Sequence, residues 1–424
     1  MSSFSQLRRL GAATLAAGAL LLAPVATAVG APGDAPPGTP GATPVTGVIE
    51  APRPAFYEPP ASIPSAPGTI IRQEPARQLL DPLGLSSRVV DARLIMYSST
   101  DRSGAPIAVT GTVFVPTARW IGLSSRPVIS YAPGTQGMAD RCAPSRTLAE
   151  SVSYEHALIK ALLARGYAVA MTDYQGLGTP GSHTYMNRQA QGQAVLDMAR
   201  AAKTIPGLRT NSPIGLMGYS QGGGAAAAAL ELARGYAPDL SVRGAVVGAV
   251  PADLARVGLN LDGSLWSAFN NFAMVGLAEG YGLDLSEVLN ERGMAAMEKT
   301  ENTCVLEFGQ FAFQNSGTLT RDGRPTTAYL AEEPWASVVA DNRIGTRRPS
   351  APVLVNHSLL DDTIPYAVGR QLAQDWCRQG GNVSFSTNAV PLHVGGMAPN
   401  LTESLAFFEA RFAGLPLISS CWRL

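Results

Sequence analysis

The sequence predicts an α/β fold in which helices flank a mainly parallel β-sheet. Three observations predict it. Between residues 128 and 250, short apolar runs alternate with longer stretches of helical periodicity, as in successive β-α-β units. Two runs rich in apolar and β-branched residues precede this region, which is typical of an antiparallel hairpin. The alternation resumes after residue 351, so the sheet should continue there.

The expected elements follow in order along the chain. The hairpin strands lie at 89–98 and 107–115 and are joined by a turn-rich segment. The parallel part has strands at 128–132, 167–172, 213–219, 242–250, 352–357 and 382–390. The helices lie at 154–165, 188–203, 221–234, 366–379 and 401–412. Because parallel neighbours need crossover connections, these helices should cover both faces of the sheet.

The alternation of strands and helices stops for about 95 residues, from 251 to 345. A gap of this length between consecutive strands predicts an inserted subdomain. Phe269, Phe272 and Gly276 follow helical spacing within it, so the insertion should be mostly helical and pack a small core of its own. The expected division of the chain is a signal peptide at 1–28, a flexible lead-in at 29–67, a core formed by 68–250 and 346–424, and a cap or lid at 251–345.

The N-terminus has the features of a secretory signal. Arg8 and Arg9 precede an uncharged stretch from residue 10 to 23, and the small residues Ala26-Thr27-Ala28 follow. The apolar stretch is too short for a membrane span, so we expect cleavage near Ala28 and release outside the cell or into the cell wall. Residues 29–67 are dominated by Pro, Gly, Ala and Thr without hydrophobic periodicity, which predicts the flexible lead-in.

The charge composition excludes some partners. Only 15% of the residues are charged, and 32 basic residues balance 32 acidic ones. Such a surface offers no electrostatic attraction for nucleic acid or for an anionic membrane.

Four cysteines are widely spaced and form no CxxC pair. In an exported protein this pattern favours two disulfides over a metal site. Three connectivities are possible, and proximity in the sequence favours Cys377 with Cys421, which leaves Cys142 with Cys304.

The most informative motif is Gly218-Tyr219-Ser220-Gln221-Gly222, which lies between an expected strand and an expected helix. A GxSxG sequence in this context is typical of the nucleophile elbow of α/β-hydrolases, where a sharp turn exposes a serine hydroxyl. The glycines are needed because a side chain at either position would collide with a neighbouring strand or helix. Ser220 is therefore the predicted nucleophile.

A serine nucleophile needs a histidine base and a carboxylate that orients it, and in this fold both follow the serine in the chain. His393, in a loop after the last expected strand, is the predicted base, and His357 is expected to serve in packing. The acid is expected at Asp361 or Asp362, after the second strand beyond the nucleophile. Asp253 is the outside candidate, with helix N-capping as its preferred role.

The oxyanion formed during acyl transfer needs two backbone N–H donors. One should come from Gln221, the residue after the nucleophile. The other should come from the glycine-containing segment 132–137, where Gln136 or Thr135 is the expected donor.

Several motifs together resemble the secretory lipase family typified by Candida antarctica lipase A, over about residues 85 to 424. They are GYSQG at 218–222, Asp-Asp-Thr-Ile-Pro-Tyr at 361–366, His393, Cys-Ala-Pro-Ser at 142–145, and Asp-Tyr-Gln-Gly-Leu-Gly at 173–178. The resemblance implies an α/β-hydrolase fold, the catalytic triad Ser220, Asp361 and His393, and the cysteine pairing favoured above. It also implies a lid-like cap at 251–345. The fungal enzyme has Asp where this chain has Gln136, so side-chain help at that position is not implied.

Residues and resemblance together predict a secreted serine hydrolase that cleaves carboxylic esters of lipids, as a triacylglycerol lipase does, through an acyl-serine intermediate. The expected enzyme needs no cofactor and no metal. The inner face of the cap is a candidate for contact with an acyl chain. The alternatives are a short-chain carboxylesterase, an acyltransferase, a peptidase on the same fold, and an inactive surface-binding protein.

Overall fold

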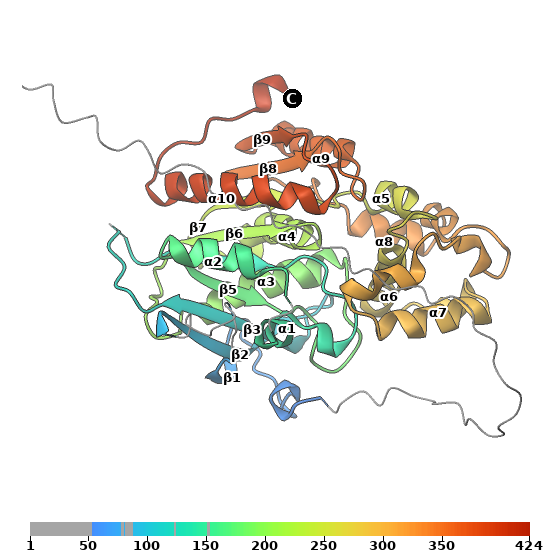
Figure 1. The fold of residues 1–424 in the computed structure, drawn as a ribbon, viewed down its shortest axis with the longest axis horizontal. Helices are drawn as coiled ribbons and strands as arrows, with labels where there is room; N and C mark the ends of the chain where they lie inside the picture. The colour runs from blue at the N-terminus through green and yellow to red at the C-terminus, as the bar shows by residue number, and fades with distance from the viewer. Residues whose placement is uncertain (1–52, 78–79, 81–87, 123, 151–152) are drawn as a thin grey trace, which may run out of the picture. The chain divides into compact units, whose positions relative to one another are not determined.

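The computed structural model describes residues 53–77, 80, 88–122, 124–150 and 153–424. The expected signal peptide at 1–28 and the first part of the expected lead-in lie outside these residues. Nine described strands form one sheet in the order β1-β2-β3-β5-β4-β6-β7-β8-β9 (Figure 1). Helices pack on both faces of the sheet, so the predicted α/β fold is confirmed.

One edge of the sheet is antiparallel and the rest is parallel. β1 (Ile70–Pro75), β2 (Val90–Thr100) and β3 (Pro106–Pro116) pair antiparallel in sequence, and β3 also pairs antiparallel with β5 (Ala168–Thr172). The parallel neighbours are β5, β4 (Val128–Ala132), β6 (Ile214–Tyr219), β7 (Val242–Gly248), β8 (Val353–Ser358) and β9 (Val383–Asn388). The predicted hairpin is β2 and β3, whereas β1 was not predicted.

Glycines decide how the helices approach the sheet. α1 (Pro144–Ala149), α2 (His156–Ala164) and α10 (Met397–Phe412) contribute to the core on one face, and α3 (Arg188–Ala202), α4 (Gln221–Tyr236) and α9 (Tyr366–Arg378) to the core on the other. A Cβ on Gly215 of β6 would lie 2.6 Å from the ring of Phe408, and one on Gly244 of β7 would lie 2.8 Å from Phe407. The two glycines thus make room for the aromatic rings of α10.

Residues 53–67 fall within the expected flexible lead-in, but the structure shows part of this segment packed against the core. Tyr57, in a short 3-10 turn at Ala55–Tyr57, is buried, and its hydroxyl bonds Ser145 Oγ at 2.8 Å. Arg53 forms an ion pair with Asp140. Composition failed to predict this because one aromatic and one charged residue carry the contact within a Pro- and Gly-rich segment.

The insertion at residues 251–345 separates β7 from β8. Its α-helices are α5 (Leu254–Leu261), α6 (Ala268–Tyr281), α7 (Glu291–Glu301) and α8 (Trp335–Asp341). Phe272, Met297 and Phe311 are buried in a cluster of the insertion's own, together with Tyr185 of the core. A Cβ on Gly276 of α6 would lie 2.3 Å from Tyr185 N, so this glycine permits close packing of α6 on the core.

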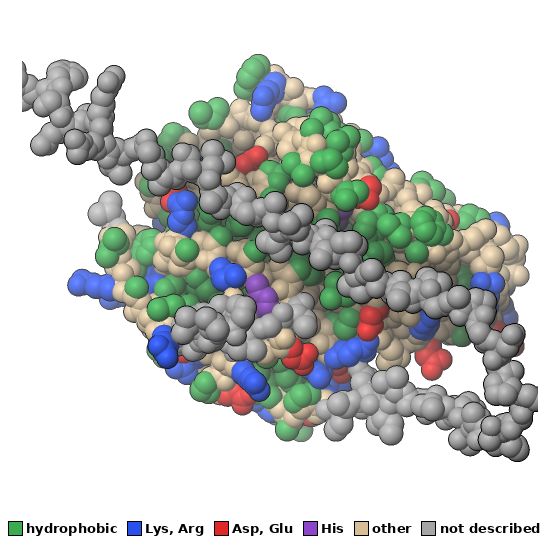
Figure 2. Space-filling view, viewed as in Figure 1, with side chains coloured by type: hydrophobic (Ala, Val, Ile, Leu, Met, Phe, Trp, Pro, Cys, Tyr) green, Lys and Arg blue, Asp and Glu red, His purple; other side chains and the backbone are tan. Residues whose placement is uncertain are grey.

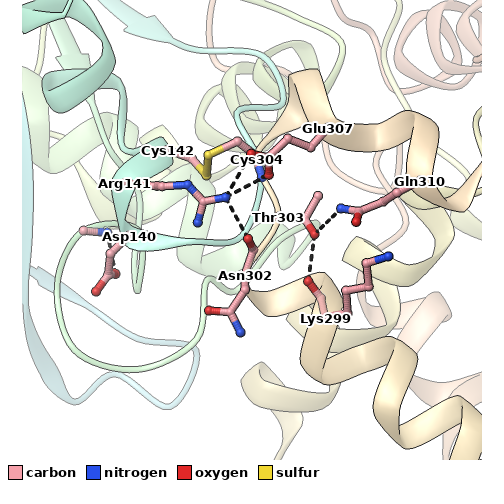
Figure 3. The surroundings of a disulfide bond; sticks show 10 residues. Asp140, Arg141, Cys142, Lys299, Asn302, Thr303, Cys304, Glu307 and Gln310 are labelled. Atoms are coloured by element: carbon pink, nitrogen blue, oxygen red, sulfur yellow. Dashed lines mark hydrogen bonds and ion pairs between the residues drawn. A yellow bond between two sulfur atoms is a disulfide. The ribbon is translucent and has the colours of Figure 1, made fainter. Parts of the chain in front are cut away.

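Two disulfides are present, Cys142–Cys304 and Cys377–Cys421, which is the pairing that sequence proximity favours. Figure 3 shows that the first one joins the core to the insertion, beside the ion pair between Arg141 and Glu307. Within the described ranges, no helix combines the length and the hydropathy that a bilayer span requires.

Candidate active site

The GxSxG motif forms a sharp turn between β6 and α4. Ser220 has φ 59° and ψ −124°, a strained conformation for a residue with a side chain. A Cβ on Gly218 would lie 2.1 Å from Gly222 O, and one on Gly222 would lie 2.0 Å from Ala132 O. A side chain at either position would thus clash with backbone atoms, which cannot move aside as a flexible side chain would. Both positions therefore require glycine.

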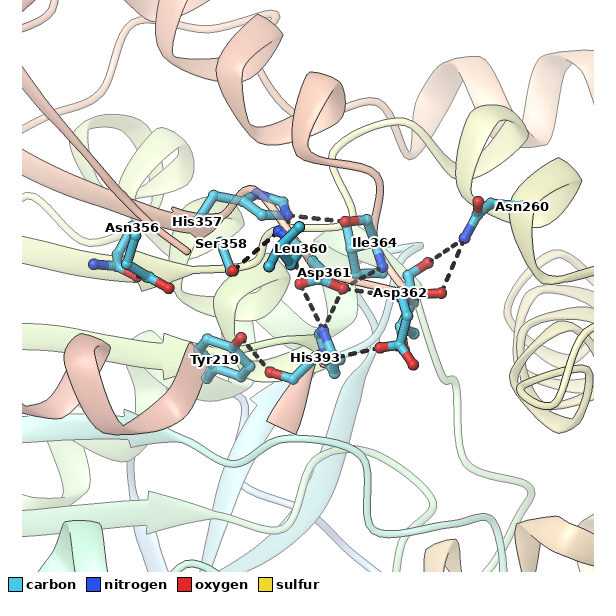
Figure 4. A network of polar contacts seen from close by, with 12 residues as sticks. Tyr219, Asn260, Asn356, His357, Ser358, Leu360, Asp361, Asp362, Ile364 and His393 are labelled. Atoms are coloured by element: carbon cyan, nitrogen blue, oxygen red, sulfur yellow. Dashed lines mark hydrogen bonds and ion pairs between the residues drawn. The ribbon is translucent and has the colours of Figure 1, made fainter. Parts of the chain in front are cut away.

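The predicted base and one of the two candidate acids are in direct contact (Figure 4). His393 Nδ1 lies 2.8 Å from Asp361 Oδ2 and 3.0 Å from Oδ1. A carboxylate facing Nδ1 holds the proton there, so Nε2 is the free acceptor of the imidazole. Among the described residues, His393 Nε2 is buried without a hydrogen-bond partner.

The loop after β8 keeps Asp361 ionised. Its Oδ1 accepts the backbone N–H groups of Thr363 at 3.0 Å and Ile364 at 2.8 Å. Burial pushes the pKa of Asp361 upward, but hydrogen bonds from His357 and His393 outweigh burial and hold this pKa well below its usual range. A permanently charged acceptor therefore faces His393 at neutral pH.

His357 and Asp253 have the structural roles preferred for them. His357, at the end of β8, is fully buried, and its Nε2 lies 2.9 Å from Ile364 O and 3.5 Å from Asp361 Oδ2. His357 thus packs against Asp361 in the interior of the protein. Asp253 caps α5 by accepting from Arg256 N at 3.2 Å and forms an ion pair with Arg343.

Asp362 faces away from the imidazole. Its Oδ1 accepts the backbone N–H of His393 at 2.8 Å, and its Oδ2 accepts the indole N–H of Trp266 at 3.0 Å. Asn260 of α5 donates to the backbone carbonyls of Asp362 and Thr363. Asp362 thus ties the histidine loop to the insertion, a role that the sequence pattern did not reveal.

The histidine loop lies beside the nucleophile turn. Tyr219, next to Ser220 in the chain, donates from its hydroxyl to His393 O at 2.6 Å, and the two rings lie 5.2 Å apart. A Cβ on Gly396 would lie 2.3 Å from that hydroxyl. Ser220, Asp361 and His393 follow β6, β8 and β9, and the carboxyl ends of parallel strands meet at one edge of the sheet.

The expected oxyanion donors lie close to the nucleophile turn. Gln221 is the first residue of α4, where a helix leaves its N–H groups without acceptors. Within the described part of the chain, the backbone N–H groups of Thr135 and Gln136 donate to no protein atom. The contact between Gly222 and Ala132 places the segment 132–137 directly against the first turn of α4.

A buried histidine holds the side chain of Gln221. Gln221 Nε2 lies 3.0 Å from His183 Nε2, and His183 Nδ1 lies 2.9 Å from Gln175 O. Both contacts are satisfied when His183 is neutral and donates from Nδ1, and burial lowers its pKa to about 4. The imidazole stacks on Tyr174. The only sequence signal for His183 was that it is one of four histidines.

Comparison with known proteins identifies the family. Residues 142–420 match the secretory lipase family. A Mycobacterium tuberculosis protein named as a probable inactive lipase is 32% identical over 85% of this chain and 82% of its own. The chain belongs to the secretory lipase family. It is therefore a carboxylic ester hydrolase of the lipase and esterase class.

Relatives of this secretory lipase also include fungal proteins. A secreted triacylglycerol lipase of Malassezia globosa is 26% identical over 87% of this chain and 80% of its own. The crystal structure of Candida antarctica lipase A in its closed state superposes with a TM-score of 0.75 at 23% identity, over 86% of this chain and 87% of that one. The structure of a cell-wall-degrading esterase of Xanthomonas oryzae has a TM-score of 0.65 at 18% identity, over 82% of this chain and 98% of that one. These structures share the fold.

The insertion of the lipase supplies most of the wall of a pocket at Ser220. The pocket encloses about 40 Å³ and is mainly apolar, and Asn270 and Thr363 are among its few polar side chains. Its other lining residues are Tyr185, Met186, Pro251, Leu254, Val257, Gly258, Leu261, Phe269, Ala273 and Ile364. A larger hollow of about 810 Å³, lined by α6 and α7, includes none of Ser220, Asp361 and His393.

Proposed function

We propose that this lipase is secreted and hydrolyses carboxylic esters of lipids through an acyl intermediate on Ser220. The observation that carries the proposal is the contact of His393 Nδ1 with the buried Asp361 carboxylate, which leaves Nε2 as a free acceptor beside the nucleophile turn. The two disulfides and the secreted Malassezia relatives support export.

The proposed reaction has two halves. His393 Nε2 takes the proton of Ser220 Oγ as the oxygen attacks the ester carbonyl, and the N–H groups of Gln221 and of Gln136 or Thr135 bind the oxyanion. The proton then passes to the leaving alcohol, which departs and leaves the acyl group on Ser220. In the second half His393 Nε2 takes a proton from a water molecule, which attacks the acyl carbonyl. The proton then passes to Ser220 Oγ as the bond to the acyl group breaks, which releases the carboxylic acid and restores the serine. Asp361 stabilises the imidazolium in both halves.

The surroundings of the site support a lipid substrate. The pocket at Ser220 is walled mainly by apolar side chains, which suits an acyl chain. Large hydrophobic side chains are exposed on the loops and helix around His393: Leu259, Leu265, Leu359, Leu360, Leu392 and Val394. Figure 2 shows hydrophobic side chains gathered where the insertion meets the core. A patch of many exposed apolar side chains is typical of a surface that binds apolar partners.

The small volume of the pocket favours one alternative, a short-chain carboxylesterase, because about 40 Å³ holds only a few carbon atoms unless the walls move. A panel of esters from acetate to oleate separates the two functions. Turnover of long-chain glycerol esters is expected for the lipase, and activity confined to soluble short esters would leave the esterase.

The nucleophile is tested by covalent labelling. A fluorophosphonate probe is expected to label the folded wild type at Ser220, and Ser220→Ala is expected to lose labelling and ester turnover while its thermal unfolding stays unchanged. Ser358, a buried serine at the end of β8, is a matched control, and Ser358→Ala should still be labelled. A folded wild type that the probe does not label would refute the proposed function.

A further inference from the structure

Two neighbouring side chains, Tyr154 and Glu155, hold the loop that follows β4. Glu155 Oε1 accepts the backbone N–H of Gly134 at 2.8 Å, and the hydroxyl of Tyr154 donates to the backbone carbonyl of Thr135 at 2.9 Å. The carbonyl and the N–H of a trans peptide point in opposite directions. Anchoring Thr135 O on Tyr154 therefore turns the Gln136 N–H away from Tyr154.

The same loop is also held by Val305 of the insertion and by Tyr185 of the core. Val305 N donates to Gln136 O at 2.7 Å, and Thr135 Oγ1 bonds the hydroxyl of Tyr185 at 2.7 Å. With the bonds to Glu155, Tyr154 and Val305 in place, the N–H groups of Thr135 and Gln136 have no acceptor among the residues that the structure describes. One of these two groups is the expected second donor to the oxyanion, beside the N–H of Gln221.

Glu155 is an unusual residue to find in this place. It is 1% exposed, its second carboxyl oxygen accepts the hydroxyl of Tyr131, and the donors to its carboxyl, Tyr131 and Gly134 N, are uncharged. Burial raises its pKa to about 7. A carboxyl group buried without a cation is costly for folding, so stability alone does not account for a glutamate here.

We propose that Glu155 and Tyr154 are positioning residues of the oxyanion loop, which set the rate of the chemical step without touching the substrate. The inference rests on the proposed acyl-serine function. Loss of the Glu155 carboxyl would leave the buried Gly134 N–H unsatisfied, so its peptide would rotate toward another acceptor. The next two N–H groups would turn with it, and small misplacements of such groups cost large factors in rate.

The test compares Glu155→Ala, Glu155→Gln and Tyr154→Phe with the wild type. Glu155→Ala is expected to lower kcat for a soluble p-nitrophenyl ester about 100-fold, with KM unchanged within about twofold, because the oxyanion forms only in the transition state. Glu155→Gln keeps an acceptor for Gly134 N and is expected to recover at least about tenfold of that loss. Tyr154→Phe removes one hydroxyl and is expected to lower kcat about fivefold to tenfold.

A second readout does not depend on the ester chosen. The rate of fluorophosphonate labelling at Ser220 should fall in parallel with kcat, because the phosphonyl oxygen occupies the same oxyanion site. Asp197→Asn is the matched control. Asp197 is a buried carboxyl on α3 that accepts from Ser99 and Tyr236 and pairs with Arg200. Its replacement should lower thermal stability without changing the labelling rate.

The role of Glu155 and Tyr154 is decided by the labelling rates of the folded variants. Wild-type labelling rates in folded Glu155→Ala and Tyr154→Phe would overturn the inference and leave the proposed function intact. An equal loss of rate in Asp197→Asn would also overturn it, since the effect would then be one of general stability. If Glu155→Ala does not fold, Tyr154→Phe decides alone, because it keeps the ring. A wild type that the probe does not label would refute the proposed function and this inference with it.

Discussion

At the scale of single residues, the two adjacent aspartates after β8 have different tasks. Asp361 faces the imidazole of His393, and Asp362 binds its backbone N–H and the indole of Trp266. Asp361→Asn is expected to lower kcat about 10⁴-fold, because an amide at this position favours the wrong imidazole tautomer. Asp362→Asn retains an acceptor oxygen and is expected to cost at least about tenfold less. Ester turnover under saturating substrate measures both, and equal losses would contradict the assignment of Asp361 as the acid.

A second residue-scale prediction concerns pH. The pKa of Glu155 is raised to about 7 in the folded protein, whereas in the unfolded chain it lies near 4.3. The native state therefore holds this proton over a pH range where the unfolded state has lost it. Its contribution to stability is present below about pH 4.3 and is lost as the pH rises through 7. The groups facing it are the phenols of Tyr131, Tyr154 and Tyr174, which stay neutral because their own pKa values are raised.

The variant Glu155→Gln has no proton to lose. The free energy of unfolding of the wild type, measured relative to this variant, should therefore fall between about pH 4.5 and 7 and level off above. Urea denaturation at several pH values measures the difference. If the free energy of unfolding depends on pH in the same way in both proteins, the pKa of Glu155 is not raised in the folded state.

At the scale of elements, the nucleophile turn depends on the space between α4 and β4. Gly222→Ala would place a methyl group 2.0 Å from Ala132 O, which is backbone, so either α4 or the oxyanion loop must shift. We expect a loss of about 1–3 kcal/mol in the free energy of unfolding and at least about 100-fold in kcat.

Gly235 is the matched control on the same helix. It is exposed, and no atom of the described residues lies within 4 Å of a Cβ built there. Gly235→Ala is expected to stabilise the protein by about 0.5–1 kcal/mol through helix propensity, with kcat unchanged. Thermal unfolding and ester turnover of the two variants check the contrast, and similar effects would mean that the packing of the turn is not what Gly222 provides.

Elements with a regular pattern were predicted well. The strands β4 to β9 and the helices α3, α4 and α9 lie within a few residues of their expected positions, because their periodicity is written in consecutive residues. β1 was missed because its burial is only partial and its residues show no alternation. α1 was missed because it is six residues long, too short to show a helical period.

At the scale of the whole molecule, the Cys142–Cys304 disulfide joins the core to the insertion across 162 residues, and Cys377–Cys421 closes a segment of 44. Loop entropy alone assigns these bonds at most about 5 and about 4 kcal/mol. The double variant Cys142→Ser/Cys304→Ser is expected to lose stability and also activity, because Cys304 precedes the Val305 N–H that holds Gln136 O.

The double variant Cys377→Ser/Cys421→Ser removes the other bond, which lies between α9 and the C-terminal end of the chain. It should lose stability alone. The melting temperature and kcat of the two double variants separate the effects. Retention of full kcat by the Cys142→Ser/Cys304→Ser variant in its folded state would show that the oxyanion loop does not need this attachment.

Contiguous residues were enough to predict the α/β sheet and the turn at Ser220, because each is encoded in a local pattern. The base His393 and the cap at 251–345 stay predictions from chain order and spacing. Spacing left open the choice between Asp361 and Asp362, and the resemblance to the secretory lipases implied Asp361. Only the folded chain shows which carboxyl faces the imidazole. The same holds for the contacts of Glu155, His183 and Trp266. They join segments far apart in the sequence, and packing between such segments leaves no periodic trace in it.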